Sequence, residues 1–169
     1  MEKFRDNLKA AVRSVSVADH MLTQTYPLIK DEKLLIGVTD KIRESCMKAF
    51  QAALDYEHIY NQVPPYHESY GPIIEAFAKY CKKYKVDKDS LDSARNVGLI
   101  IDEHKRCPVE FTRKGQFVIC SDDYDLKKVS VRDLSRFIST TKEIITKIQD
   151  RIDASERLFR RGTKQHTEC

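Results

Sequence analysis

The chain has 169 residues, of which 33% are charged and 41% are hydrophobic, and its formal net charge is +4. This length indicates a single domain, and the composition is typical of a helix-rich globular protein rather than a disordered chain or a histone-like polycation. No stretch approaches the roughly 18 apolar residues of a membrane span, and the N-terminus contains acids that a signal peptide lacks, so the sequence predicts a cytoplasmic protein without a membrane partner.

Two long helices are predicted near the N-terminus. Apolar residues recur at alternating steps of four and three over residues 3–26, which gives the single apolar stripe of an amphipathic helix. Pro27 should end this helix, because the residue before a proline is pushed out of the helical region. A second helix should cover residues 31–62, with Asp31 capping its free amides.

The middle of the chain is predicted to contain a loop and two shorter helices. The segment NQVPPYHESYGP is rich in proline and aromatic residues and is the clearest loop in the sequence. A short helix should begin at Gly71-Pro72, because proline is tolerated in the first helical turn. Another helix should cover residues 90–105, where Gly98 would allow a neighbouring helix to approach closely.

In residues 109–120 the spacing of apolar residues changes from that of a helix to the alternation of a strand. The runs VEFT and QFVI flank the tripeptide RKG, which is the pattern of a β-hairpin with a three-residue loop and glycine in the left-handed position. In that register Phe111 would pair with Phe117, and the apolar residues would share one face. A two-residue loop would place these apolar residues on both faces of the hairpin. We therefore expect the three-residue loop, with the phenylalanine-rich face packed on the helices.

A last, long helix should begin at Ser130, where Asp133 completes a pattern like a capping box, and its apolar repeat continues to Phe159. Residues 161–169 have no apolar face and are expected to form a flexible C-terminal tail. These elements together predict a mainly α fold. Its architecture would be a long antiparallel bundle of about five helices in one domain, residues 1–160, with one β-hairpin inserted before the last helix.

Two segments carry a resemblance to known proteins: EHKRCPVEFTRKGQFVICSD and VADHMLTQTYPLIKDEKLL. They resemble a family of uncharacterised archaeal helical-bundle proteins, and the resemblance extends over residues 17–148 but implies no established activity. A wider similarity is to HEPN-type bundles, which include RNA-processing ribonucleases. That ribonuclease pattern needs an arginine with a histidine four to six residues later. Here Arg95 is followed by His104, nine positions on and on the opposite helix face, so HEPN catalysis is not carried over.

Three acid-histidine doublets are the other candidates for chemistry: Asp19-His20, Glu57-His58 and Glu103-His104. Adjacent helical residues do not share a face, so no doublet alone makes a metal site. His20 could join Asp55 and His58 if the first two helices pair, but partly buried structural histidines are the better expectation. The five cysteines form no C-x-x-C pair and are expected to be reduced core residues. We therefore predict no catalytic residue, no metal and no cofactor.

Clustered positive charge is the clearest candidate for a binding surface. The residues expected to bind nucleic acid are Lys82, Lys83, Lys105, Arg106, Arg113 and Lys114. Such cations would contact phosphates without reading sequence, and nearby aromatic rings could stack on unpaired bases. The alternative is that these cations bind no ligand and form a solvated surface, where neighbouring acidic residues balance their charge. The predicted function is an interaction module with RNA or a ribonucleoprotein as its partner. The alternatives are a divergent HEPN-like ribonuclease using His104 and a structural homodimer.

Overall fold

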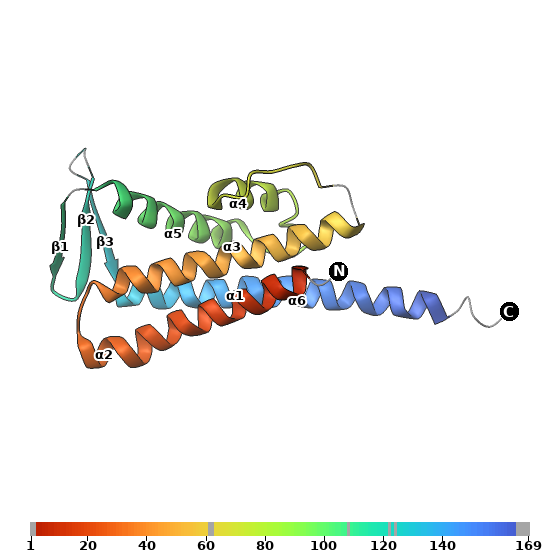
Figure 1. Cartoon of the computed structure of the whole chain (residues 1–169), viewed down its shortest axis with the longest axis horizontal. Helices are drawn as coiled ribbons and strands as arrows, with labels where there is room; N and C mark the ends of the chain where they lie inside the picture. The colour runs from red at the N-terminus through yellow and green to blue at the C-terminus, as the bar shows by residue number, and fades with distance from the viewer. Residues whose placement is uncertain (1–2, 61–62, 108, 122, 124, 165–169) are drawn as a thin grey trace.

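The computed structural model describes residues 3–60, 63–107, 109–121, 123 and 125–164, with side chains up to residue 160. Within that part, five helical runs and a three-stranded sheet before the last run confirm the outline of the predicted fold (Figure 1). The elements are α1 (Lys3–His20), η1 (Met21–Thr25), α2 (Tyr26–Ile29), α3 (Leu34–Tyr60), α4 (Tyr70–Ala78), α5 (Lys88–Arg106), β1 (Val109–Arg113), β2 (Gln116–Cys120), β3 (Leu126–Ser130) and α6 (Val131–Lys164).

Long helices lie side by side, and the sheet lies across one end of them (Figure 1). Two ion pairs fix the direction of α1 relative to α6. Arg5, early in α1, contacts Glu156 at 2.8 Å, late in α6. Asp19, late in α1, contacts Lys142 at 2.6 Å, earlier in α6. The two helices are therefore antiparallel. None of the helices in the described residues is both long enough and apolar enough to cross a membrane.

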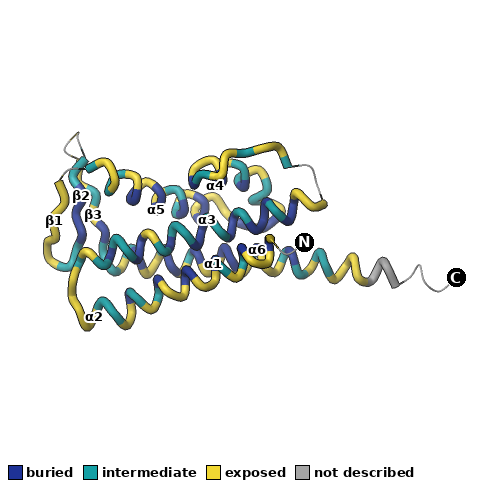
Figure 2. Tube along the Cα trace, in the orientation of Figure 1, coloured by how far each residue is buried: buried dark blue, intermediate teal, exposed yellow. Residues whose placement is uncertain are grey.

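Buried residues follow the inward faces of the helices (Figure 2), and most of them are apolar. Phe50 and Phe77 pack with ring centroids 4.6 Å apart, and Phe77 also packs on Tyr84 at 5.5 Å. Burying one such large side chain stabilises the fold by about 1.5–3 kcal/mol. The core therefore joins α3, α4 and the turn after α4.

Gly98 allows the close approach that the sequence predicted. A Cβ atom at this position would lie 2.5 Å from Cε1 of Tyr70, far inside van der Waals contact. The Tyr70 hydroxyl donates a hydrogen bond of 2.7 Å to the Ala94 carbonyl, one turn earlier in α5. Glycine is therefore required here because the tyrosine ring of α4 lies directly on the α5 backbone.

The first helical run does not stop at Pro27, so that expectation is wrong. It passes through the π-helical turn η1, in which the Tyr26 amide donates to the Met21 carbonyl, five residues back instead of four. Pro27 then lies in the first turn of α2, where a missing amide donor is tolerated. The run ends at Lys30, whose left-handed conformation (φ 52°) directs its amide to the Tyr26 carbonyl at 2.8 Å.

The hairpin register differs from the predicted one. Arg113 pairs with Gln116, so the turn contains two residues, Lys114 and Gly115, rather than three. Both have positive φ values, 48° and 74°, as the hairpin turn of type I′ requires. Phe111 consequently pairs with Val118, and the three-residue loop is wrong.

A third strand, β3, explains why the apolar residues of the hairpin can lie on both faces of the sheet. It pairs antiparallel with β2 and makes β2 the central strand. Phe117, Val118 and Ile119 are all buried, although successive residues point to opposite faces. Val118 is buried on the face opposite to Phe117, beside its cross-strand neighbours Phe111 and Lys128, so this central strand does not need all of its apolar residues on one face.

The start of α6 has the predicted capping arrangement. The Asp133 amide donates to Ser130 Oγ at 3.2 Å, and the Ser130 amide donates to Asp133 Oδ2 at 3.2 Å. The helix continues to Lys164. The remainder of the predicted flexible tail, residues 165–169, lies outside the described residues.

Candidate nucleic-acid interface

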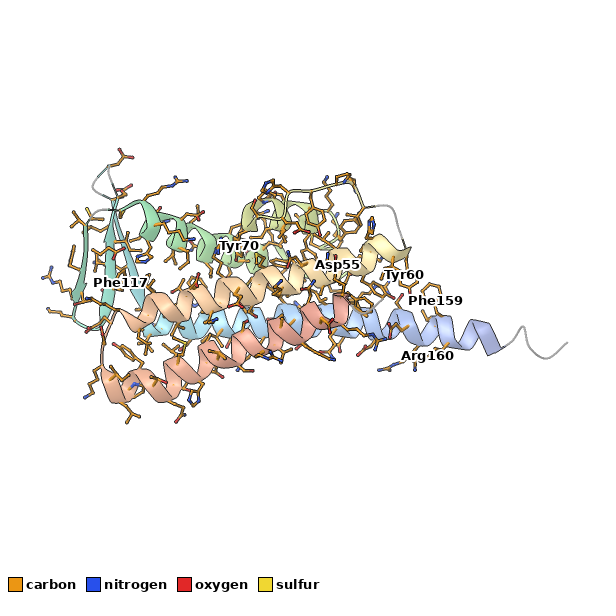
Figure 3. All side chains as sticks on the ribbon, viewed as in Figure 1. Asp55, Tyr60, Tyr70, Phe117, Phe159 and Arg160 are labelled. Carbon is orange, nitrogen blue, oxygen red and sulfur yellow. The ribbon has the colours of Figure 1, made fainter. Side chains whose placement is uncertain are left out.

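The sheet has an inner face toward the helices and an outer face away from them, because side chains alternate along each strand. Phe117 lies between the strands and the helices (Figure 3). With it on the inner face are Ile119 and Val129, and the exposed fraction of each of these three side chains is at most 3%. The outer face carries large apolar side chains that stay exposed: Val109 (54%), Phe111 (41%) and Leu126 (54%).

The outer face contains a cleft of about 320 Å³, which we call the outer-face cleft. It lies over all three strands, and three of its side chains are cationic while none is acidic. The lining residues are Phe111, Arg113, Lys114, Gln116, Val118, Leu126 and Lys128. An exposed aromatic ring thus lies among cations, which is the combination that binds phosphates and stacks on unpaired bases.

The cations of the outer-face cleft differ from the other lysine of β3 in their charge partners. Within the described residues, Arg113, Lys114 and Lys128 form no ion pair with a carboxylate. Lys127, the neighbour of Lys128, points inward instead and contacts Glu103 at 2.7 Å. Alternation along β3 therefore separates a structural lysine from one that faces solvent.

The six cations predicted to bind nucleic acid do not form one patch. Arg113 and Lys114 line the outer-face cleft, while Lys105 and Arg106 lie at the C-terminal end of α5. The strand β1 separates the two pairs; it is five residues long, so at ~3.3 Å per residue they lie roughly 15 Å apart.

The other two predicted cations, Lys82 and Lys83, lie in the turn after α4. Lys83 forms an ion pair of 2.6 Å with the buried carboxylate of Glu57 in α3. Lys128 was missed because no strand was predicted for the segment LKKVS. Its alternation, with Leu126 and Lys128 on one face, was the available signal.

A larger cleft of about 900 Å³ lies behind β1, between the inner face of that strand, the end of α5 and the start of α3. Its lining residues are Lys33, Ile36, His104, Cys107, Glu110, Phe111, Thr112 and Phe117. Nδ1 of His104 contacts the Glu110 carboxylate, and the imidazole meets the Phe117 ring edge-on with centroids 5.9 Å apart. The Cys107 thiol donates to the Cys120 carbonyl at 2.6 Å.

Arg95 and His104, the two residues of the HEPN comparison, have different partners. Arg95 contacts Glu75 at 2.9 Å and Asp92 at 2.7 Å. His104 contacts Glu110 at the other end of the helix. The geometry gives no shared site for the arginine and the histidine.

The histidines of the other two acid-histidine doublets are not the partly buried structural residues that the sequence indicated. His20 and His58 are both exposed. Asp55 does not meet His20 either. It accepts a hydrogen bond of 2.8 Å from Asn7, and Asn7 lies at the opposite end of α1. No three acidic, histidine or cysteine side chains of the described residues are grouped as metal ligands.

Cys46 fits the prediction of a reduced core residue. Its side chain is buried and lies 3.4 Å from the Thr141 hydroxyl. Burial raises the pKa of the thiol to about 11, because the thiolate would lose its solvation there. Cys81 and Cys120 are half-buried free thiols, and Cys107 is half-buried as well.

No protein-family model matches the chain, and no curated protein matches it.

Proposed function

We propose that this chain is an interaction module that binds single-stranded RNA on the outer face of its sheet. One observation carries the proposal: an exposed phenylalanine, Phe111, lies in a cleft whose charged side chains are all cationic. Arg113, Lys114 and Lys128 would contact consecutive phosphates, and Phe111 would stack on one base. Such stacking contributes about 1–3 kcal/mol per base and needs an unpaired base, which favours a single strand over a duplex.

The helices serve as the scaffold in this proposal. We propose that α1, α3, α5 and α6 act as one elongated antiparallel bundle that holds the sheet at its end. The phosphate contacts position the strand without reading its sequence, so the module would accept many RNA sequences or a ribonucleoprotein. Cys46, Cys81 and Cys120 are free thiols, which supports a reducing compartment, the cytoplasm.

Fluorescence anisotropy with labelled oligouridine tests the proposal. Arg113→Gln, Lys114→Gln and Lys128→Gln together should weaken binding. They should also lower the slope of log K against log salt by about 2 units, since each contact to a single strand contributes about 0.7. The matched control removes three exposed cations outside the sheet: Lys9, Arg13 and Lys88.

An unchanged salt slope in the outer-face triple variant, or an equal loss in the control, would refute the outer-face cleft as the RNA contact. The same samples separate the alternatives. Cleavage of the RNA would identify a ribonuclease, for which the His104–Glu110 contact in the large cleft is the one favourable observation. Neither binding nor cleavage, with a doubled mass in solution, would identify a structural homodimer.

A further inference from the structure

A second cationic cleft, of about 550 Å³, lies between the turn after α4 and the C-terminal half of α6. We call it the α6 cleft. Four of its side chains are cationic and one is acidic. The lining residues are Lys83, Tyr84, Lys85, Lys147, Asp150, Arg151 and Ala154. It shares no residue with the outer-face cleft.

The floor of the α6 cleft is held in place by a buried network. Tyr84 and Glu57 are each only 1% exposed. The Tyr84 hydroxyl donates to Glu57 Oε1 at 2.8 Å, and Lys83 Nζ contacts Glu57 Oε2 at 2.6 Å. Satisfied buried networks of this kind are rigid, so the cleft is formed before any ligand binds.

Two of the four cations are already neutralised, and two are not. Lys83 pairs with Glu57, and Lys147 pairs with Glu143 at 2.6 Å. Within the described residues, neither Lys85 nor Arg151 has an ion-pair partner. Uncompensated positive charge in a concave surface attracts anions more strongly than the same charge on a convex one.

Lys85 is also held in an unusual backbone conformation. Its φ of 55° is left-handed, a region that favours glycine, and its amide donates to the Lys82 carbonyl at 3.2 Å. A lysine therefore occupies a position where glycine would have a lower conformational energy.

We infer that the α6 cleft binds a phosphate monoester. Lys85 and Arg151 approach from two different elements, a turn and a helix, which suits the oxygens of a tetrahedral phosphate better than a planar carboxylate. Arginine binds two phosphate oxygens at once, and lysine adds a point charge. The volume exceeds what inorganic phosphate needs and lies within the roughly 300–1,000 Å³ of small-molecule sites. The ligand is thus a nucleotide-sized phosphomonoester, either free or at the end of an RNA strand.

Titration calorimetry with AMP and adenosine tests the inference on the full chain. The two probes differ only in the phosphate, so wild type should bind AMP more tightly. Arg151→Gln should weaken AMP binding about tenfold or more, because a charge-assisted hydrogen bond to phosphate is lost. Lys85→Gly should weaken it as well. Because glycine relieves the left-handed strain at this position, loss of binding in that variant cannot be attributed to unfolding. Lys9→Gln with Arg13→Gln is the control and should bind AMP like wild type.

Two RNA strands identify the source of the phosphate. One carries a 5′-phosphate, and the other has the same sequence with a 5′-hydroxyl. A preference for the phosphorylated strand that disappears in Arg151→Gln assigns the cleft to RNA ends, while AMP binding without such a preference assigns it to free nucleotides. Equal affinity of wild type for AMP and adenosine overturns the inference, as does unaltered AMP binding in both Arg151→Gln and Lys85→Gly. The inference is independent of RNA binding on the sheet, whose triple variant leaves this cleft intact.

Discussion

The two phenylalanines of the hairpin should respond very differently to truncation. Phe117 is 3% exposed and belongs to the core, so Phe117→Ala should lower the free energy of unfolding by about 3–5 kcal/mol. Phe111 is 41% exposed on the outer face, so slightly more than half of its surface is buried. Complete burial of a phenylalanine contributes about 1.5–3 kcal/mol, which gives roughly 1–2 kcal/mol for Phe111→Ala.

Thermal unfolding followed by circular dichroism measures the difference. In a chain of this size each kcal/mol shifts the melting temperature by about 2–4 °C. Phe117→Ala should therefore lower it by roughly 6–20 °C and Phe111→Ala by roughly 2–8 °C. The order reverses for RNA binding. Phe111→Ala should lose a stacked base, about 1–3 kcal/mol, and Phe117→Ala should bind normally below its melting temperature.

Equal losses of stability in the two variants would refute the two-residue turn. In the three-residue register Phe111 and Phe117 form one cross-strand pair on one face, so they would be buried together and lost at similar cost. An RNA affinity that depends on Phe117 instead of Phe111 would place the ligand on the inner face. Either result would remove the basis of the outer-face cleft.

Three further predictions concern the turn, the core and the thiols. Lys114→Asn should raise stability by up to about 1 kcal/mol, because asparagine suits the first position of a type I′ turn, yet it should reduce the salt slope of RNA binding by about 0.7. Gly98→Ala should lower the melting temperature through its contact with Tyr70, at a cost of about 1–3 kcal/mol. Gly71→Ala, where nothing lies within 4 Å, should not; equal effects in calorimetry would contradict the packing. The pKa of Cys46 is raised from 9.0 to about 11. Its burial therefore stabilises the fold fully below pH 9.0, and this contribution is lost as the pH rises toward 11. Rapid labelling of Cys46 by a maleimide at neutral pH, followed by mass spectrometry, would contradict its burial.

Sequence patterns located the helices well because helix ends carry local signals. Ser130 and Asp133 cap α6 as their spacing indicated. The continuation past Pro27 was not predictable, because a π-helical turn has no comparable signature.

The sheet was harder to predict because the register of the hairpin depends on a strand that lies outside the hairpin. The hairpin was found, but its register depended on β3, and that strand is only five residues long. Once β3 pairs with β2, Phe111 and Lys128 flank Val118 on the outer face, so Val118 can be buried there and the argument for a single apolar face no longer applies. Prediction of the candidate site was limited in the same way. Arg113 and Lys114 were identified by charge alone, whereas Lys128 joins them only through the tertiary pairing of β2 with β3.

Ser130 belongs to two elements at once. It pairs with Gln116 as the last residue of β3, and its hydroxyl caps α6, which begins at the next residue. No linker residue separates the strand from the helix at this point. One inserted residue would either shift the register of β3, so that its side chains exchange faces, or move Ser130 away from its capping position. Because no residue separates β3 from α6, we expect the sheet to move together with α6 rather than about a hinge at this junction. Sequence length can vary in the loop before α4 without such a penalty, but the junction at Ser130 should tolerate neither insertion nor deletion.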